Sequence, residues 1–128
     1  MKTIFKSGDI KQYRLRVAEA DCAAFHGVVV HPVYATFALA RDFEWSSRLF
    51  FLEMKDDDEE GVGTMLYIEH KGMARIGDEV LITATVESLK ETELICTIEA
   101  TCQGRVIAIG KTGQKMLKKE KLYRLMNK

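Results

Sequence analysis

Four residues of this chain have the types and spacing that acid–base chemistry requires: Thr36, Glu44, Gly63 and His70. Histidine best suits proton transfer near neutral pH, and a carboxylate can assist it as an acid, a base or an orienting group. A threonine hydroxyl can position a carbonyl or a water, or attack as a nucleophile when a base lies nearby. A glycine in a strand often marks a bulge or a close approach of ligand to backbone. These residues therefore indicate a candidate catalytic site.

Each of the four also has a purely structural interpretation, which the pattern leaves open. Glu44 could lie on the flank of a helix, where its carboxylate reaches water or pairs with Arg48, four residues later. His70 could be a hydrogen-bonded residue at the rim of the core, and Thr36 could bond to a nearby carbonyl. Gly63 could mark only the passage from a loop into a strand.

A long helix is predicted over 33–54, where apolar residues recur at helical spacing just after the only proline, Pro32. On this helix Glu44 shares a stripe with apolar residues that include Phe37 and Phe51, so we expect it to be partly desolvated. Thr36 and Glu44 would lie about 12 Å apart along a regular helix and could not touch. They would contact different parts of one substrate or share a water.

From residue 62 onward the apolar residues alternate with polar ones, which predicts long antiparallel strands joined by turns near 75–78, 88–93 and 103–104. A further strand is predicted over 13–17, a loop or helical turn over 21–30, a solvated acidic loop over 55–61, and a short helix or frayed tail after 117. One sheet with one apolar face can bury that face by wrapping around the helix. The predicted class is α+β, an antiparallel sheet around one long central helix, which is the hot-dog fold. Because such a sheet has exposed edges, we expect a homo-oligomer, at least a dimer.

The composition is that of one globular domain over residues 1–128. Basic and acidic residues number 19 each, so the chain lacks the basic excess typical of nucleic-acid binders. No apolar run approaches the roughly 20 residues that span a bilayer, and the N-terminal segment lacks the apolar stretch of a signal peptide, so we expect a cytoplasmic protein that does not enter the membrane. The three cysteines show no paired spacing, which favours buried thiols, and no metal-ligand spacing is present.

Two segments carry a resemblance to a known family, residues 33–44 (VYATFALARDFE) and 61–87 (GVGTMLYIEHKGMARIGDEVLITATVE). They resemble the hot-dog acyl-CoA thioesterases of the fluoroacetyl-CoA thioesterase type, which carry an ATPxL…E helix, a VGTxxxxxH strand and a PxGxxV turn. Thr36, Glu44, Gly63 and His70 match that family's threonine, glutamate, glycine and histidine in type and spacing. The resemblance extends over roughly 33–117.

The resemblance implies hydrolysis of a short- or medium-chain acyl-CoA thioester to CoA and a carboxylic acid, with no cofactor other than the CoA of the substrate. His70 and Glu44 would be the acid–base and orienting groups, and Thr36 the nucleophile or the residue that positions water. Gly63 and Thr64 would bind the substrate or its oxyanion.

The chain departs from the family pattern at three places. Phe37 replaces the usual proline, the stretch before the helix (FHGVVVH) has aliphatic residues nearest the helix, and Gln114 stands where relatives tend to carry an arginine. We therefore do not predict selectivity for fluoroacetate. Two other functions remain open: a non-catalytic protein that binds acyl-CoA or another acyl ligand, and a hot-dog dehydratase or hydratase, for which no matching aspartate is present.

Overall fold

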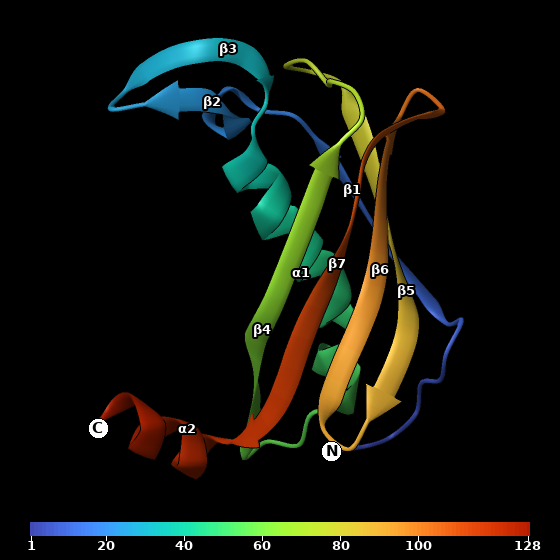
Figure 1. Ribbon diagram of the computed structural model, residues 1–128, viewed down its shortest axis with the longest axis vertical. Coiled ribbons are helices and arrows are strands. Elements are labelled where there is room, and N and C mark those ends of the chain that lie inside the picture. The colour runs from blue at the N-terminus through green and yellow to red at the C-terminus, as the bar shows by residue number, and fades with distance from the viewer.

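The computed structural model describes all residues 1–128 and contains a five-stranded antiparallel main sheet, a separate two-stranded hairpin, one long helix and one short C-terminal helix (Figure 1). The main sheet has the strand order β1-β5-β6-β7-β4. Its strands are β1 (Ile10–Arg16), β4 (Glu59–His70), β5 (Glu79–Lys90), β6 (Glu93–Cys102) and β7 (Arg105–Lys118). The other elements are η1 (Glu19–Asp21), β2 (Cys22–Phe25), β3 (Val28–Tyr34), α1 (Thr36–Met54) and α2 (Lys119–Met126).

The core lies between α1 and the inner face of the main sheet, as the hot-dog prediction requires. Phe43, Phe50 and Phe51 of α1 are fully buried against alternate residues of β5 and β6, such as Ile82 and Ile98. The short turns also lie where they were predicted. Gln103 and Gly104 both have positive φ values, 52° and 75°, which is the geometry that a two-residue hairpin turn needs. The predicted fold is confirmed, and all three cysteines are buried.

The predicted start of the helix was wrong by three residues. Val33 and Tyr34 belong to β3, and the helix begins at Thr36. Pro32 lies inside β3 and not in the first helical turn. A two-stranded ribbon tolerates a proline because its outer N–H groups have no partner to lose, and the β-branched residues Val28–Val30 and Val33 of the same strand favour extended backbone. The segment predicted as a loop or helical turn is the β2–β3 hairpin, preceded by η1.

The predicted solvated loop over 55–61 was also partly wrong. β4 starts at Glu59, whose side chain is buried and ion-paired with the amino group of Met1 at 2.8 Å. At the other end of the chain, the tail forms the short helix α2. Neither helix is long and apolar enough to cross a lipid bilayer.

The expectation that Glu44 is partly desolvated was wrong, and the alternative that it reaches water is confirmed, because α1 turns a neighbouring stripe toward the sheet. The buried positions follow the spacing of Leu39, Phe43, Phe50 and Met54. Glu44 is exposed, and so is Phe37, which keeps 53% of its surface. The outward face of α1 therefore carries the glutamate toward solvent beside the edge strand β4.

Candidate active site

The fold brings Thr36 and His70 together, although they lie 34 positions apart in the chain. Thr36 is the first residue of α1 and His70 the last residue of β4, and the two elements meet at this end of the sheet. Thr36 Oγ1 lies 2.9 Å from His70 Nε2. Which atom donates depends on the histidine tautomer. Both side chains are exposed, so a substrate can reach the hydrogen-bonded hydroxyl–imidazole pair.

A second pair forms farther along the same two elements, where Glu44 faces Gly63. Glu44 Oε1 lies 3.7 Å from the position that a Cβ on Gly63 would occupy. The two residues share a pocket of about 290 Å³ whose lining also includes Arg41, Trp45, Arg48, Gly61 and Gln114. A small residue at position 63 thus leaves room beside the carboxylate for a ligand or a water.

The strand pairing is irregular at this point, as a glycine bulge predicts. Gly63 pairs with Gln114 and Met65 with Gly113, which leaves Thr64 as an extra residue. The Thr64 hydroxyl lies 2.9 Å from the position of a Cβ on Gly113. Since Gly113 and Gln114 point to opposite faces of β7, that hydroxyl is turned away from Glu44. Only the backbone of Thr64 can serve this pocket, and the loop-to-strand interpretation of Gly63 was wrong because β4 starts four residues earlier.

The two pairs stay separate within one chain. Thr36 and Glu44 both lie in the regular part of α1, and eight residues of helix separate them by about 12 Å. Glu44 is not paired with Arg48 either, because Arg48 Nη2 binds Glu60 Oε1 at 2.5 Å. A single chain therefore carries Thr36 and His70 at one end of β4, with Glu44 and Gly63 near the middle of that strand.

The carboxylate buried in α1 is Asp42, which was missed in the sequence. It is only 3% exposed, accepts a hydrogen bond of 2.5 Å from the hydroxyl of Tyr34, and binds Arg41 Nε at 3.0 Å. Arg41 also binds Asp21 at 2.9 Å. Burial and the contact with Asp42 raise the pKa of Tyr34, and the hydrogen bonds to Asp42 and Asp21 raise the pKa of Arg41. The network holds Arg41, a lining residue of the Glu44 pocket, to the root of the β2–β3 hairpin.

Asp42 could have been recognised from its spacing, because it lies on the stripe that includes Leu39 and Phe43. The partners of the Asp42 network, Asp21 and Tyr34, could not be recognised in the sequence, because only the tertiary fold brings them close to Asp42 and Arg41.

Gln114 is the other polar residue that supports this pocket. It is 5% exposed, and its Nε2 donates to Ser47 Oγ at 2.7 Å. Ser47 in turn donates to the backbone carbonyl of Glu44 at 3.1 Å. The neutral amide therefore ties β7 to the turn of α1 that carries Glu44, at the position where relatives tend to have an arginine.

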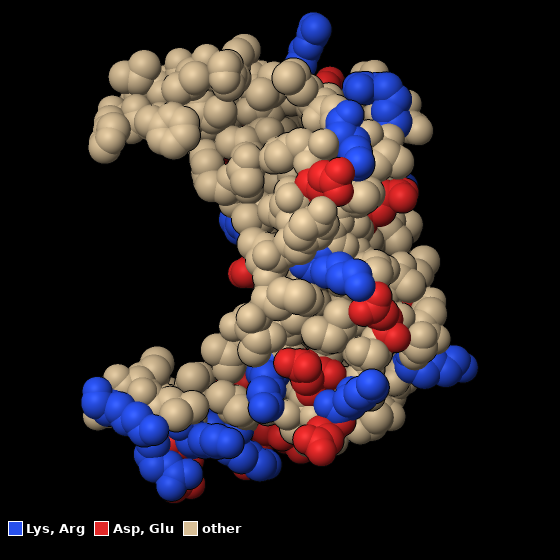
Figure 2. Space-filling view, in the orientation of Figure 1, with Lys and Arg blue, Asp and Glu red and all other residues tan.

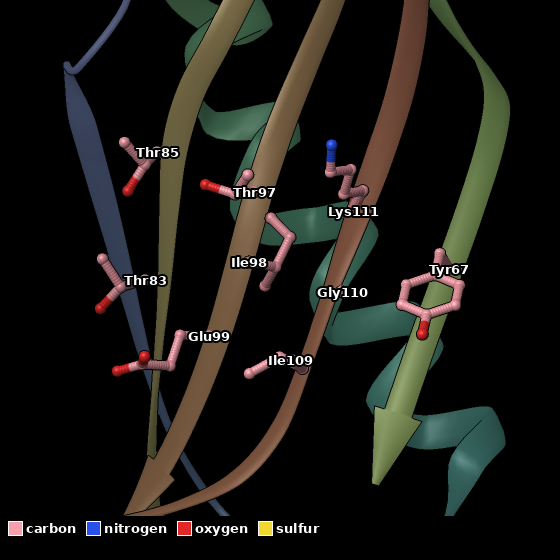
Figure 3. Close-up of a pocket in the computed structure, with 9 residues that line it drawn as sticks. All are labelled: Tyr67, Thr83, Thr85, Thr97, Ile98, Glu99, Ile109, Gly110 and Lys111. Atoms are coloured by element: carbon pink, nitrogen blue, oxygen red, sulfur yellow. The ribbon is translucent and has the colours of Figure 1, made fainter.

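A larger pocket lies elsewhere, on the outer face of the sheet (Figure 3). It measures about 500 Å³ and lies over strands β4 to β7. Its polar lining consists of three threonines with Tyr67, Glu99 and Lys111. None of the predicted site residues lines it, whereas Glu44 and Gly63 both line the smaller pocket, so the smaller pocket is the better candidate.

Comparisons with known proteins agree with the fold. A search of curated proteins finds no match. A hypothetical protein of Thermus thermophilus, described as a thioesterase superfamily member, is 28% identical with a TM-score of 0.92, over 99% of this chain and 93% of that one.

Two structures of the fluoroacetyl-CoA thioesterase FlK share the fold. One is 18% identical with a TM-score of 0.88, over 96% of each chain. The other, a mutant in complex with acetyl-CoA, is 16% identical with a TM-score of 0.87, over 96% of this chain and 97% of that one. The family model described as "FlK: Fluoroacetyl-CoA-specific thioesterase" matches residues 17–120, which include all the candidate site residues. This chain therefore belongs to the FlK thioesterase family.

Proposed function

We propose that this protein hydrolyses short- or medium-chain acyl-CoA thioesters to CoA and a carboxylic acid. The observation that carries the proposal is the hydrogen bond of 2.9 Å between Thr36 Oγ1 and His70 Nε2, which couples a hydroxyl to a base. Family membership supports the reaction class, and the acetyl-CoA complex of an FlK mutant supports the substrate class.

The chemistry needs few groups, because a thiolate is a good leaving group. The acyl carbon gains a bond to oxygen, either from water directly or first from Thr36, and loses its bond to sulfur. His70 takes the proton of the attacking oxygen and returns it to the departing sulfur. When Thr36 attacks first, water then releases the acid from the acyl-threonine. Backbone N–H groups at Gly63 and Thr64 are the donors that we assign to the transient oxyanion.

A homodimer is part of the proposal, because β4 is an edge strand with an exposed middle. Its five residues from Gly63 to Tyr67 are all exposed, and they include the large side chains of Met65 and Leu66. β4 is 12 residues long and lies at the end of the sheet order. A long, apolar and unpaired edge favours pairing with a second copy of the same strand.

Antiparallel pairing of two β4 strands would also unite the separated halves of the site. A register that sets Gly63 of one subunit opposite His70 of the other has its two-fold axis between Leu66 and Tyr67, in the middle of the exposed stretch. Opposed residues then lie about 5 Å apart. Glu44, beside Gly63, would reach the Thr36–His70 pair of the neighbouring subunit. Each dimer would hold two complete sites.

The test is release of free thiol from acetyl-, butyryl-, hexanoyl-, phenylacetyl- and palmitoyl-CoA by the purified protein. We expect turnover that is highest for one of the short or medium chains. If a folded protein binds the esters but releases free thiol from none of them, hydrolysis is refuted and the non-catalytic binding function takes its place.

A further inference from the structure

The β2–β3 hairpin projects from the body with both of its faces uncovered. Phe25 keeps 69% of its surface exposed, and Val28 and Val29, which point to opposite faces of β3, are also exposed. The hairpin joins the body at its root, where the N–H of Tyr34 donates to the carbonyl of Ala74. A two-stranded ribbon alone is marginally stable in water, so its apolar side chains need a covering partner.

The helix α2 forms a second projection with an uncovered apolar side. Tyr123, Leu125 and Met126 are exposed, while Leu122 is half-buried. At helical spacing these four side chains share one side, and Lys121 and Arg124 lie on the other. A helix of eight residues is too short to be stable by itself, and none of its residues is buried.

The two projections lie at opposite ends of β4 and point to the same side of the molecule. The hairpin root lies beyond His70, and α2 joins the body where the N–H of Lys119 donates to the carbonyl of Asp58. Figure 2 shows the resulting hollow outline, with the hairpin at the upper left and α2 at the lower left. No Lys, Arg, Asp or Glu lies between Cys22 and Ala40, and the hairpin surface in Figure 2 is accordingly free of charged colours.

A two-fold axis through the middle of β4 exchanges the two ends of this hollow. The α2 of one subunit then comes to the hairpin of the other, at both ends of the dimer. An interface of this kind must be self-complementary, and apolar α2 against an uncharged apolar hairpin meets that condition. Within one chain the two cannot meet, because a strand of 12 residues separates them by about 40 Å.

We propose that the apolar side of α2 docks on the β2–β3 hairpin of a second copy of this chain. The inference rests on the β4 dimer proposed above. The hairpin leads directly into Ala35 and Thr36, so the docked helix steadies the segment that positions the Thr36–His70 pair. The site would thus depend on the neighbouring subunit for support as well as for Glu44.

The test is a double variant, Val29→Cys with Met126→Cys, treated with a short bismaleimide in the otherwise intact protein. Docking in trans predicts a covalent dimer on a denaturing gel. The matched control pairs Met126→Cys with Ile10→Cys, an exposed position on the far edge strand β1, and should give no covalent dimer. The native chain and each single variant control for the three buried cysteines and for links between identical positions.

Sedimentation of the same samples separates the two proposals. If the protein sediments as a dimer but the Val29→Cys/Met126→Cys variant gives no more covalent dimer than the Ile10→Cys control, the docking of α2 is refuted and the β4 dimer is retained. A monomer would overturn both. Thiol release, measured in parallel, reports separately on the hydrolytic function.

Discussion

Mixing two inactive variants tests whether the site is shared between subunits. Glu44→Ala and His70→Ala each place the same defect in both sites of a homodimer, and loss of an acid–base residue costs about 10²- to 10⁴-fold in rate. In a heterodimer of the two, one site receives His70 from one chain and Glu44 from the other, and the second site lacks both. Random exchange puts half of the chains into heterodimers, so about one quarter of wild-type activity should return.

The structure offers a matched control for that experiment. Thr36 and His70 lie 2.9 Å apart in one chain, so mixing Thr36→Ala with His70→Ala produces no intact pair. That mixture should stay inactive. The assay is thiol release by the unfractionated mixture after co-expression of the two chains. Heterodimers isolated through two different affinity tags should show about one half of wild-type activity, because one of their two sites is intact. If the Glu44 and His70 variants together recover no more activity than the control mixture, the shared site is refuted.

Three further properties follow from the packing. Gly110→Ala should destabilise the fold by about 2 kcal/mol or more in urea unfolding, because the added Cβ would lie 1.9 Å from the carbonyl oxygen of Tyr67. The control Gly72→Ala adds a Cβ that meets only ordinary van der Waals contacts, and it should cost less than about 1 kcal/mol. Burial raises the pKa of Cys96 to about 12, so this thiol should react with a disulfide reagent at pH 8 only after unfolding; rapid reaction of the native protein would contradict its burial. Burial acts to raise the pKa of Glu59, but the terminal amino group and the N–H of Asp56 outweigh burial and lower this pKa overall. The Glu59 carboxylate therefore stabilises the fold above about pH 4.5, and this stabilisation is lost as the pH falls through the lowered pKa. Glu59→Gln should flatten the acid side of a plot of unfolding free energy against pH, and an unchanged acid side would exclude a stabilising role for Glu59.

The sheet and its turns could be predicted from sequence because their signals are local. Alternation along β5 and β6 assigns the inward face, and the Gln103–Gly104 turn needs residues that tolerate positive φ. The same holds for the bulge at Gly63. These features depend only on a few neighbouring residues, so they can be predicted without knowledge of the tertiary fold.

The face of α1 could not be assigned in the same way, because apolar residues lie on more than one side of the helix. Phe37, Trp45 and Leu52 are exposed, although each looks like a core residue in the sequence. Because of this ambiguity, Glu44 was assigned to an apolar stripe and Asp42 was overlooked.

The joining of Thr36 to His70 was predicted only through the family resemblance, since 34 positions separate the two residues. The buried network around Asp42 had no such guide. Its partners come from η1 and β3, in the segment that was predicted as a loop and the start of the helix. An error in local structure thus concealed a tertiary contact.

The most direct test of the central claim is kcat/KM for the best acyl-CoA substrate, compared between the wild type and His70→Ala, with the affinity for the ester measured by calorimetry. We predict that kcat/KM falls by about 10²- to 10⁴-fold while the ester still binds with nearly unchanged affinity. Equal rates for the two proteins would show that the Thr36–His70 pair does not carry the reaction.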